Sequence, residues 1–328
     1  MTPYLEIGGD YREVLPGVHI LELPLPFSLG LINVYLVRLT DGWMLIDTGM
    51  DTEHCFNALD RAREGVGVAW SDIRTILLTH IHPDHMGLVR QVTALSGARL
   101  ILHNADARHL ADLADLEKAR DFQHRVLASA GVSAETISKM ETSLEEIRKT
   151  FYRLEPDVPL SGGETIGTTI GDLQVIWTPG HSPGHICLYQ ADRRVLFSGD
   201  HILEHISPNI GWQPDHDALG EFLSSLDRIA ALQVDLVLPS HGAPFRGHRE
   251  WVAKTRAHHA ERCDLLLAAL DGQRKTAAEL IPSLWNRPLS PFHYRFALFE
   301  LLAHLDHMER TGRVRSCDDA GIAKWSRL

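Results

Sequence analysis

The segment Thr79-His80-Ile81-His82-Pro83-Asp84-His85 places three histidines and an aspartate within six residues. The apolar run before it, Ile73–Leu78, predicts a buried strand that ends at Thr79. In an extended loop, residues two apart face the same side, so His80 and His82 can reach one cation. Pro83 suits the first position of a helix, which puts Asp84 and His85 in its opening turn. This strand-to-helix junction therefore predicts ligands for two metal ions.

Three further donors follow predicted strands in the second half of the chain. His181 comes after Leu173–Trp177, Asp200 after Val195–Phe197, and His241 after Val234–Leu238. Strand ends that meet turns are the usual place for active-site residues in α/β folds.

The predicted elements divide the chain into parts of different character. Strand-like runs alternate with helical patterns in the first 100 residues and again from about 173 to 238, which predicts sheets covered by helices. Between them, about 105–154 reads as a helical hairpin, which either only packs or forms a lid or substrate wall. Residues 247–328 read as a small, mainly helical domain that resembles a winged helix.

Composition narrows the class of protein. The chain has 328 residues, 44% of them hydrophobic and 23% charged, which is typical of a folded globular protein. We find neither a membrane-spanning run nor a secretion signal, so we expect a cytoplasmic protein. The four cysteines are far apart and form no Cys-x-x-Cys pair, so any metal site is expected to use nitrogen and oxygen ligands.

The order of the motifs resembles that of the metallo-β-lactamase superfamily. The similarity rests on the segment from Thr79 to His85 and on four further segments: Leu45–Gly49, Gly180–His185, Ser198–Asp200 and Ser240–Gly242. It implies an α/β fold, an αββα sandwich over residues 1–246 that carries the helical insertion, followed by the winged-helix-like domain at 247–328.

The resemblance also implies a ligand set for two divalent metal ions, with zinc first and manganese or iron as alternatives. His80, His82 and His181 would bind one ion, and Asp84, His85 and His241 the other, with Asp200 bridging them. Asp47 and His185 would support the ligands, and His201 would either do so or lie on the surface. His205 and Asn209 are candidates for substrate contact, although a simple polar turn explains them equally well.

Two such ions about 3.5–4 Å apart activate a shared water and polarise the group under attack. We therefore expect a bridging hydroxide as nucleophile, with Asp84 as the catalytic residue that orients it and accepts its proton. The predicted reaction is hydrolysis of a small ester, thioester or lactone.

Three alternatives stay open. Core motifs are shared with glyoxalase II, a thioesterase. The C-terminal part is similar to the branch that contains the lactamase-β-like endoribonucleases, so RNA or another phosphodiester is the second candidate substrate. A mononuclear iron persulfide dioxygenase would carry similar ligands. A winged-helix DNA-binding regulator would be a function of another class.

Charge weighs against nucleic acid as a partner. The net charge is −11, and residues 1–248 carry 19 Lys and Arg against 33 Asp and Glu, whereas 249–328 carry 13 against 10. Such an acidic catalytic region repels phosphates. We expect a small-molecule substrate and no membrane. The C-terminal domain is expected to pack against the catalytic domain or against a twin subunit, so a homodimer is an option.

Overall fold

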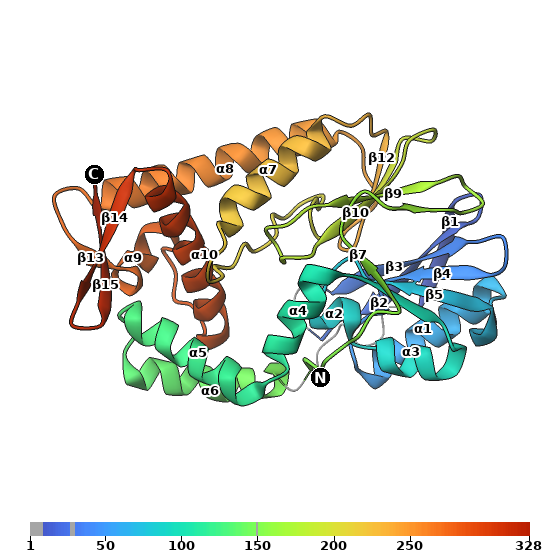
Figure 1. Ribbon diagram of the computed structural model, residues 1–328, viewed down its shortest axis with the longest axis horizontal. Coiled ribbons are helices and arrows are strands. Elements are labelled where there is room, and N and C mark those ends of the chain that lie inside the picture. Colours follow the sequence, from blue (N-terminus) through green and yellow to red (C-terminus); the bar gives the residue numbers. More distant parts are fainter. Residues whose placement is uncertain (1–8, 27–29, 149) are drawn as a thin grey trace.

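The computed structural model describes residues 9–26, 30–148 and 150–328, with side chains of helix α6 described as far as Thr142. Two β-sheets lie face to face (Figure 1). The first sheet has the strand order β1-β2-β3-β4-β5-β6-β7; its strands are β1 Asp10–Leu15, β2 Val18–Pro24, β3 Leu31–Arg38, β4 Trp43–Ile46, β5 Ile73–Leu77, β6 Arg99–His103 and β7 Val158–Leu160. The second has the order β12-β11-β10-β9-β8; its strands are β8 Thr165–Ile166, β9 Leu173–Trp177, β10 Ile186–Gln190, β11 Val195–Gly199 and β12 Leu236–Pro239.

Alternation along the strands produces the layers. In β3, Tyr35 and Val37 pack into the core between the two sheets, whereas Val34 and Leu36 face the helices on the outer side. Successive side chains of a strand point to opposite faces, so a strand that is apolar throughout is buried on both. The predicted αββα sandwich is confirmed.

Helices cover both outer faces. α1 (Glu53–Val66), α2 (Pro83–Met86) and α3 (Val89–Ser96) belong to the first sheet, and α7 (Ala218–Ala230) packs on the second. Local signals fix their ends: the Thr52 hydroxyl accepts a hydrogen bond from the Cys55 amide at the start of α1, and Gly67 ends it at φ 82°.

The insertion is helical, as predicted, but it forms three helices rather than a hairpin: α4 (Asn104–Leu113), α5 (Leu116–Ser129) and α6 (Ala134–Arg148). The break between α4 and α5 falls at Asp115, whose side chain caps α5 by accepting from the Lys118 amide. The helices cross to the C-terminal part of the chain, where α6 packs on α10 (Pro291–Arg310) and the Ala130 carbonyl accepts from the Ala278 amide.

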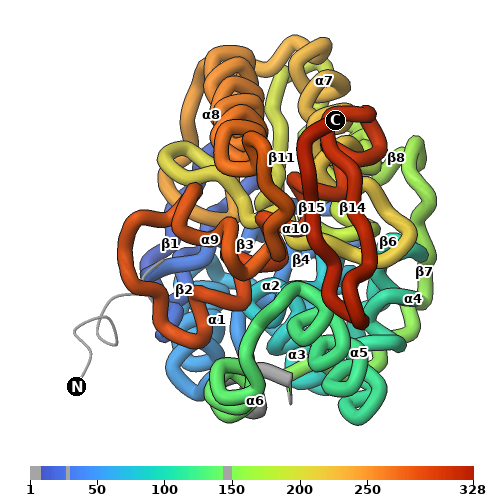
Figure 2. Tube along the Cα trace, turned by 90° about the vertical axis from the view of Figure 1, so that its left-hand side faces the viewer, coloured from blue at the N-terminus to red at the C-terminus, as the bar shows by residue number. Residues whose placement is uncertain are grey.

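The C-terminal part begins with the long helix α8 (His248–Ala269). Then follow β13 (Lys275–Thr276), α9 (Ala277–Leu284), α10, β14 (Val314–Asp319) and β15 (Ile322–Arg327), and the three strands pair in the order β13-β15-β14. Figure 2 shows this hairpin on the same side of the molecule as α5 and α6. A small, mainly helical module is thus present, while its assignment as a winged helix and the boundary at residue 247 stay predictions.

Among the described residues, no helix is both long and apolar enough to cross a membrane.

Candidate metal centre

The predicted junction after β5 has the expected conformation. His82 is the residue before α2, with extended backbone angles, and Pro83 opens the helix. Asp84 falls in the first turn and His85 in the last turn of this short helix. His80 and His85 are fully buried, whereas His82 and Asp84 are partly exposed.

The other donors arrive from the second sheet. His181 lies on the loop after β9, Asp200 directly follows β11, and His241 is the second residue after β12. Gly180 lets the first of these loops turn, because it has φ 132° and a Cβ there would stand 2.5 Å from the Cα of Phe222. Loops from both sheets therefore meet at one end of the sandwich.

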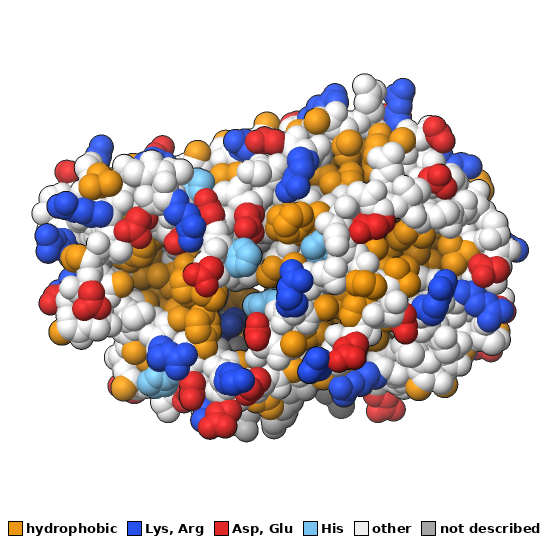
Figure 3. All heavy atoms as spheres, in the orientation of Figure 1, with side chains coloured by type: hydrophobic (Ala, Val, Ile, Leu, Met, Phe, Trp, Pro, Cys, Tyr) orange, Lys and Arg blue, Asp and Glu red, His pale blue; other side chains and the backbone are white. Residues whose placement is uncertain are grey.

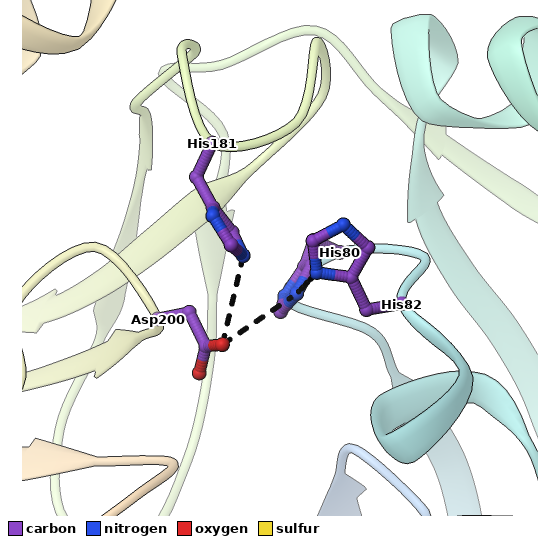
Figure 4. Close-up of side chains that lie close together, drawn as sticks. All are labelled: His80, His82, His181 and Asp200. Atoms are coloured by element: carbon purple, nitrogen blue, oxygen red, sulfur yellow. Dashed lines mark hydrogen bonds and ion pairs between the residues drawn. The ribbon is translucent and has the colours of Figure 1, made fainter. Parts of the chain in front are cut away.

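The first cluster consists of His80, His82, His181 and Asp200, whose donor atoms all lie within 4.8 Å of one another (Figure 4). Nε2 of His80 is 3.0 Å from Nδ1 of His82. Oδ2 of Asp200 lies 3.6 Å from Nε2 of His181 and 4.0 Å from Nε2 of His80.

The second cluster, Asp84, His85 and His241, meets the same 4.8 Å limit. Oδ2 of Asp84 is 3.3 Å from Nε2 of His241 and 3.8 Å from Nε2 of His85. The other carboxylate oxygen of Asp200, Oδ1, is 3.5 Å from each of these two imidazole nitrogens. Asp200 thus presents one oxygen to each cluster.

Several buried atoms at this place lack a hydrogen-bond partner among the described residues: Nε2 of His85, His181 and His241, and Oδ1 of Asp200. In each of these three histidines the other ring nitrogen, Nδ1, forms a hydrogen bond with an oxygen. These acceptors are Asp47 Oδ2 at 2.8 Å, the Asn209 carbonyl at 2.8 Å and the Leu31 carbonyl at 3.0 Å.

Since Nδ1 carries the proton in such a pair, Nε2 is left with a lone pair that points into the cluster. Leaving so many buried acceptors unpaired would be costly, and a cation removes that cost. The donor set therefore fits a dinuclear metal site of nitrogen and oxygen ligands.

The protein groups favour an ionised carboxylate and, in the first cluster, a neutral imidazole. Burial opposes ionisation of Asp200, but the neighbouring His241 and His85 outweigh it and hold the pKa of the carboxyl well below its usual range. Burial, together with the nearby His181, lowers the pKa of His82 to about 3. Against the effect of burial, Asp200 raises the pKa of both His85 and His241, so a metal ion has to displace a proton from these two rings.

Asp47 and His185 form hydrogen bonds with residues of the two clusters and of their loops. Asp47 accepts from the Thr79 amide and hydroxyl, both at 2.8 Å, and from His85 Nδ1. Nε2 of His185 accepts from the Asp200 amide at 3.1 Å, and its Nδ1 is 2.8 Å from the Thr178 hydroxyl. Asp47 therefore holds the loop after β5, and His185 holds the backbone at Asp200.

The remaining candidates lie apart from the two clusters. His201 is buried against Phe222, with ring centroids 5.1 Å apart, so it is not a surface residue. His205 is exposed, and its ring lies 3.1 Å from the Glu204 carboxylate. Asn209 contacts His181 through its backbone carbonyl, while its side chain turns toward α10.

Two supporting residues are absent from the sequence predictions. Asp106 of α4 accepts from the Ser182 hydroxyl at 2.8 Å and from the Gly184 amide at 2.6 Å, which fixes the loop of His181. Asn33 donates to the carbonyls of Pro239 and Gly242, which fixes the loop of His241. A lone asparagine inside the apolar run Leu31–Val37 is a signal that could have identified the second; the first has none.

Comparison with known proteins agrees with the fold. The sequence family described as the metallo-β-lactamase superfamily matches residues 28–241, and a metallo-β-lactamase-like C-terminal domain family matches residues 263–328. A crystal structure of a metallo-β-lactamase family protein from Thermus thermophilus is 33% identical, with a TM-score of 0.84, and the match covers 96% of this chain and 100% of that one.

Two curated relatives are more distant. The probable metallo-hydrolase YqjP of Bacillus subtilis is 26% identical, over 90% of this chain and 93% of its own length. The human acyl-coenzyme A thioesterase MBLAC2 is 27% identical, over 66% of this chain and 75% of its own length. Together with the two clusters, these matches show that the chain belongs to the metallo-β-lactamase superfamily and is a metal-dependent hydrolase.

Proposed function

We propose that this protein hydrolyses a carbonyl ester or thioester at a dinuclear centre, with acyl thioesters as the first substrate class to test. The observation that carries the proposal is Asp200, whose two carboxylate oxygens face two separate groups of imidazole nitrogens. His80, His82 and His181 would hold one ion and Asp84, His85 and His241 the other. Zinc is the metal we expect first, because tetrahedral nitrogen and oxygen sites suit it.

Divalent cations bound there would lower the pKa of a coordinated water and polarise the scissile carbonyl. The protein itself would position the attacking water and accept a proton from it. Asp84 is ionised at neutral pH, because His85 and His241 outweigh the effect of burial and keep the pKa of its carboxyl below the usual value. Its side chain is also 13% exposed, on the accessible rim of the site, so it can orient the water and accept its proton.

An aromatic contact between the insertion and the chain that leads to α10 supports an acyl substrate. Figure 3 shows the face hollowed at its middle, with histidines at the hollow and hydrophobic side chains gathered on its left side. Phe122 of α5 stacks on Trp212 at an interplanar angle of 7°, and the Trp212 amide donates to the Phe299 carbonyl of α10. The insertion would then act as a substrate wall rather than as a hairpin that only packs.

The test is a substrate panel on purified protein loaded with zinc or manganese, containing acyl thioesters, esters, lactones and single-stranded RNA. We expect thioester or ester hydrolysis that falls by about 100- to 10,000-fold in Asp84→Asn, which keeps the shape of the side chain but not its basicity. The proposal fails if no ester or thioester is turned over. RNA cleavage that disappears in Asp84→Ala would support the phosphodiesterase instead, and oxygen uptake with one iron per chain would support the dioxygenase.

A further inference from the structure

A line of polar contacts runs from the C-terminal helices to the first metal cluster. Nη1 of Arg262, on α8, lies 2.9 Å from Oε1 of Glu300, on α10. Oε2 of the same carboxylate accepts from the side-chain amide of Asn209 at 2.8 Å. The backbone carbonyl of Asn209 in turn accepts from Nδ1 of His181 at 2.8 Å.

The first two members are well fixed. The side chains of Arg262 and Glu300 are only 17% and 12% exposed. The guanidinium lies over the ring of Trp285, 4.8 Å from its centroid, and its Nε donates to His258 at 2.8 Å. Each oxygen of Glu300 therefore has its own partner, and the carboxylate has little freedom to rotate.

The second cluster is supported differently. His241 donates to the Leu31 carbonyl and His85 to Asp47, and both acceptors belong to the first sheet or the loop that follows it. The hydrogen bond of His181 to Asn209 is different, because Asn209 is in turn bonded to Glu300 of α10, which pairs with Arg262 of α8. Loosening the C-terminal contact should therefore affect one cluster and spare the other.

We propose that Glu300 is a positioning residue for His181. It anchors Asn209, so that the Asn209 carbonyl keeps the His181 ring turned with Nε2 toward the first cluster. Partners of metal ligands typically change metal affinity by about 10- to 100-fold when removed, and Glu300 acts one step further away, so we expect about tenfold. The inference rests on the proposed metal centre.

The experiment is a cobalt titration of the metal-free full chain, followed by visible absorption. The steps are assigned with His82→Ala, which removes a donor of the first cluster, and His241→Ala, which removes one of the second. In Glu300→Ala and in Asn209→Ala we expect the first-cluster step to weaken by about tenfold and the second to stay unchanged. Because both residues act through one hydrogen bond, the double variant should be no weaker than the weaker single variant.

Glu309→Ala is the matched control, since this glutamate of the same helix accepts from the Ser316 amide and leads nowhere near the site. Glu300→Gln keeps an acceptor for Asn209 and should bind cobalt more tightly than Glu300→Ala; it also serves, with Asn209→Ala, if Glu300→Ala does not fold. Unchanged steps in these variants, equal weakening of both steps, or the same effect in Glu309→Ala would overturn the inference. A native chain that binds no cobalt would instead refute the proposed centre itself.

Discussion

Asp47 shows how much of the site depends on a single side chain. It sits in the left-handed backbone region at φ 60°, which is unusual for a residue other than glycine and is best tolerated by asparagine and aspartate. From there its carboxylate accepts from both the amide and the hydroxyl of Thr79 and from His85. It therefore connects the loop of the first cluster to a donor of the second.

The variant Asp47→Asn tests this role without disturbing the backbone. Asparagine tolerates the same φ, but its amide nitrogen cannot accept, so at least one of the three hydrogen bonds is lost. We expect zinc affinity to fall by about 10- to 100-fold in competition with a chelator, while the far-ultraviolet circular dichroism spectrum is unchanged. An affinity equal to that of the native chain would contradict this account of Asp47.

At the scale of elements, two buried histidines join α8 to α10. Nδ1 of His259 lies 3.1 Å from Nε2 of His304, whose Nδ1 donates to the Glu300 carbonyl. His304 Nε2 is therefore the acceptor and His259 the donor, so both rings are neutral. Burial lowers the pKa of His259 to about 2 and that of His304 to about 4.

A pH dependence of stability follows. In the unfolded chain these rings take up protons below about pH 6.5, whereas the folded protein keeps them neutral, so stability is complete above that pH and is lost as the pH falls. For His259 the loss between pH 7 and pH 5 is about 2 kcal/mol. We expect the free energy of unfolding of His259→Asn, which retains a donor for His304, to fall by about 2 kcal/mol less than that of the native chain between pH 7 and pH 5, as measured by urea unfolding. An equal fall in both proteins would show that His259 is not responsible.

The elements also show what can be predicted from sequence. The junction from β5 to α2 can be predicted from sequence because its signals are local: an apolar run, a proline and donors at fixed spacing. The break between the first two helices of the insertion, α4 and α5, depends on the cap at Asp115, a weaker signal inside a continuous helical pattern. Contacts such as Asp106 with Gly184 or Asn209 with Glu300 join residues 78 and 91 positions apart, and nothing local to either residue announces them.

At the scale of the whole molecule, one hydrophobic core joins all three parts. It contains Leu127 and Met140 of the insertion, Phe222 of α7, and Leu266 and Leu301 of the C-terminal helices. The predicted boundary at residue 247 cuts through this cluster. A chain that ends at 246 would expose the buried faces of α7 and of the insertion to water.

We therefore expect the full chain to unfold in a single transition, with circular dichroism and tryptophan fluorescence giving the same midpoint. Residues 1–246 alone should not reach a folded state with native zinc affinity. Two separate transitions, or a stable fragment that binds zinc like the full chain, would show that the C-terminal part is an independent domain.

The number of metal ions bound per chain tests the central claim most directly. Elemental analysis of the native protein, after removal of loosely bound metal, should find two ions per chain, because Asp200 faces two complete donor groups. His82→Ala and His241→Ala should each retain one. A single ion in the native chain, or two ions in both variants, would contradict a dinuclear centre built from these residues.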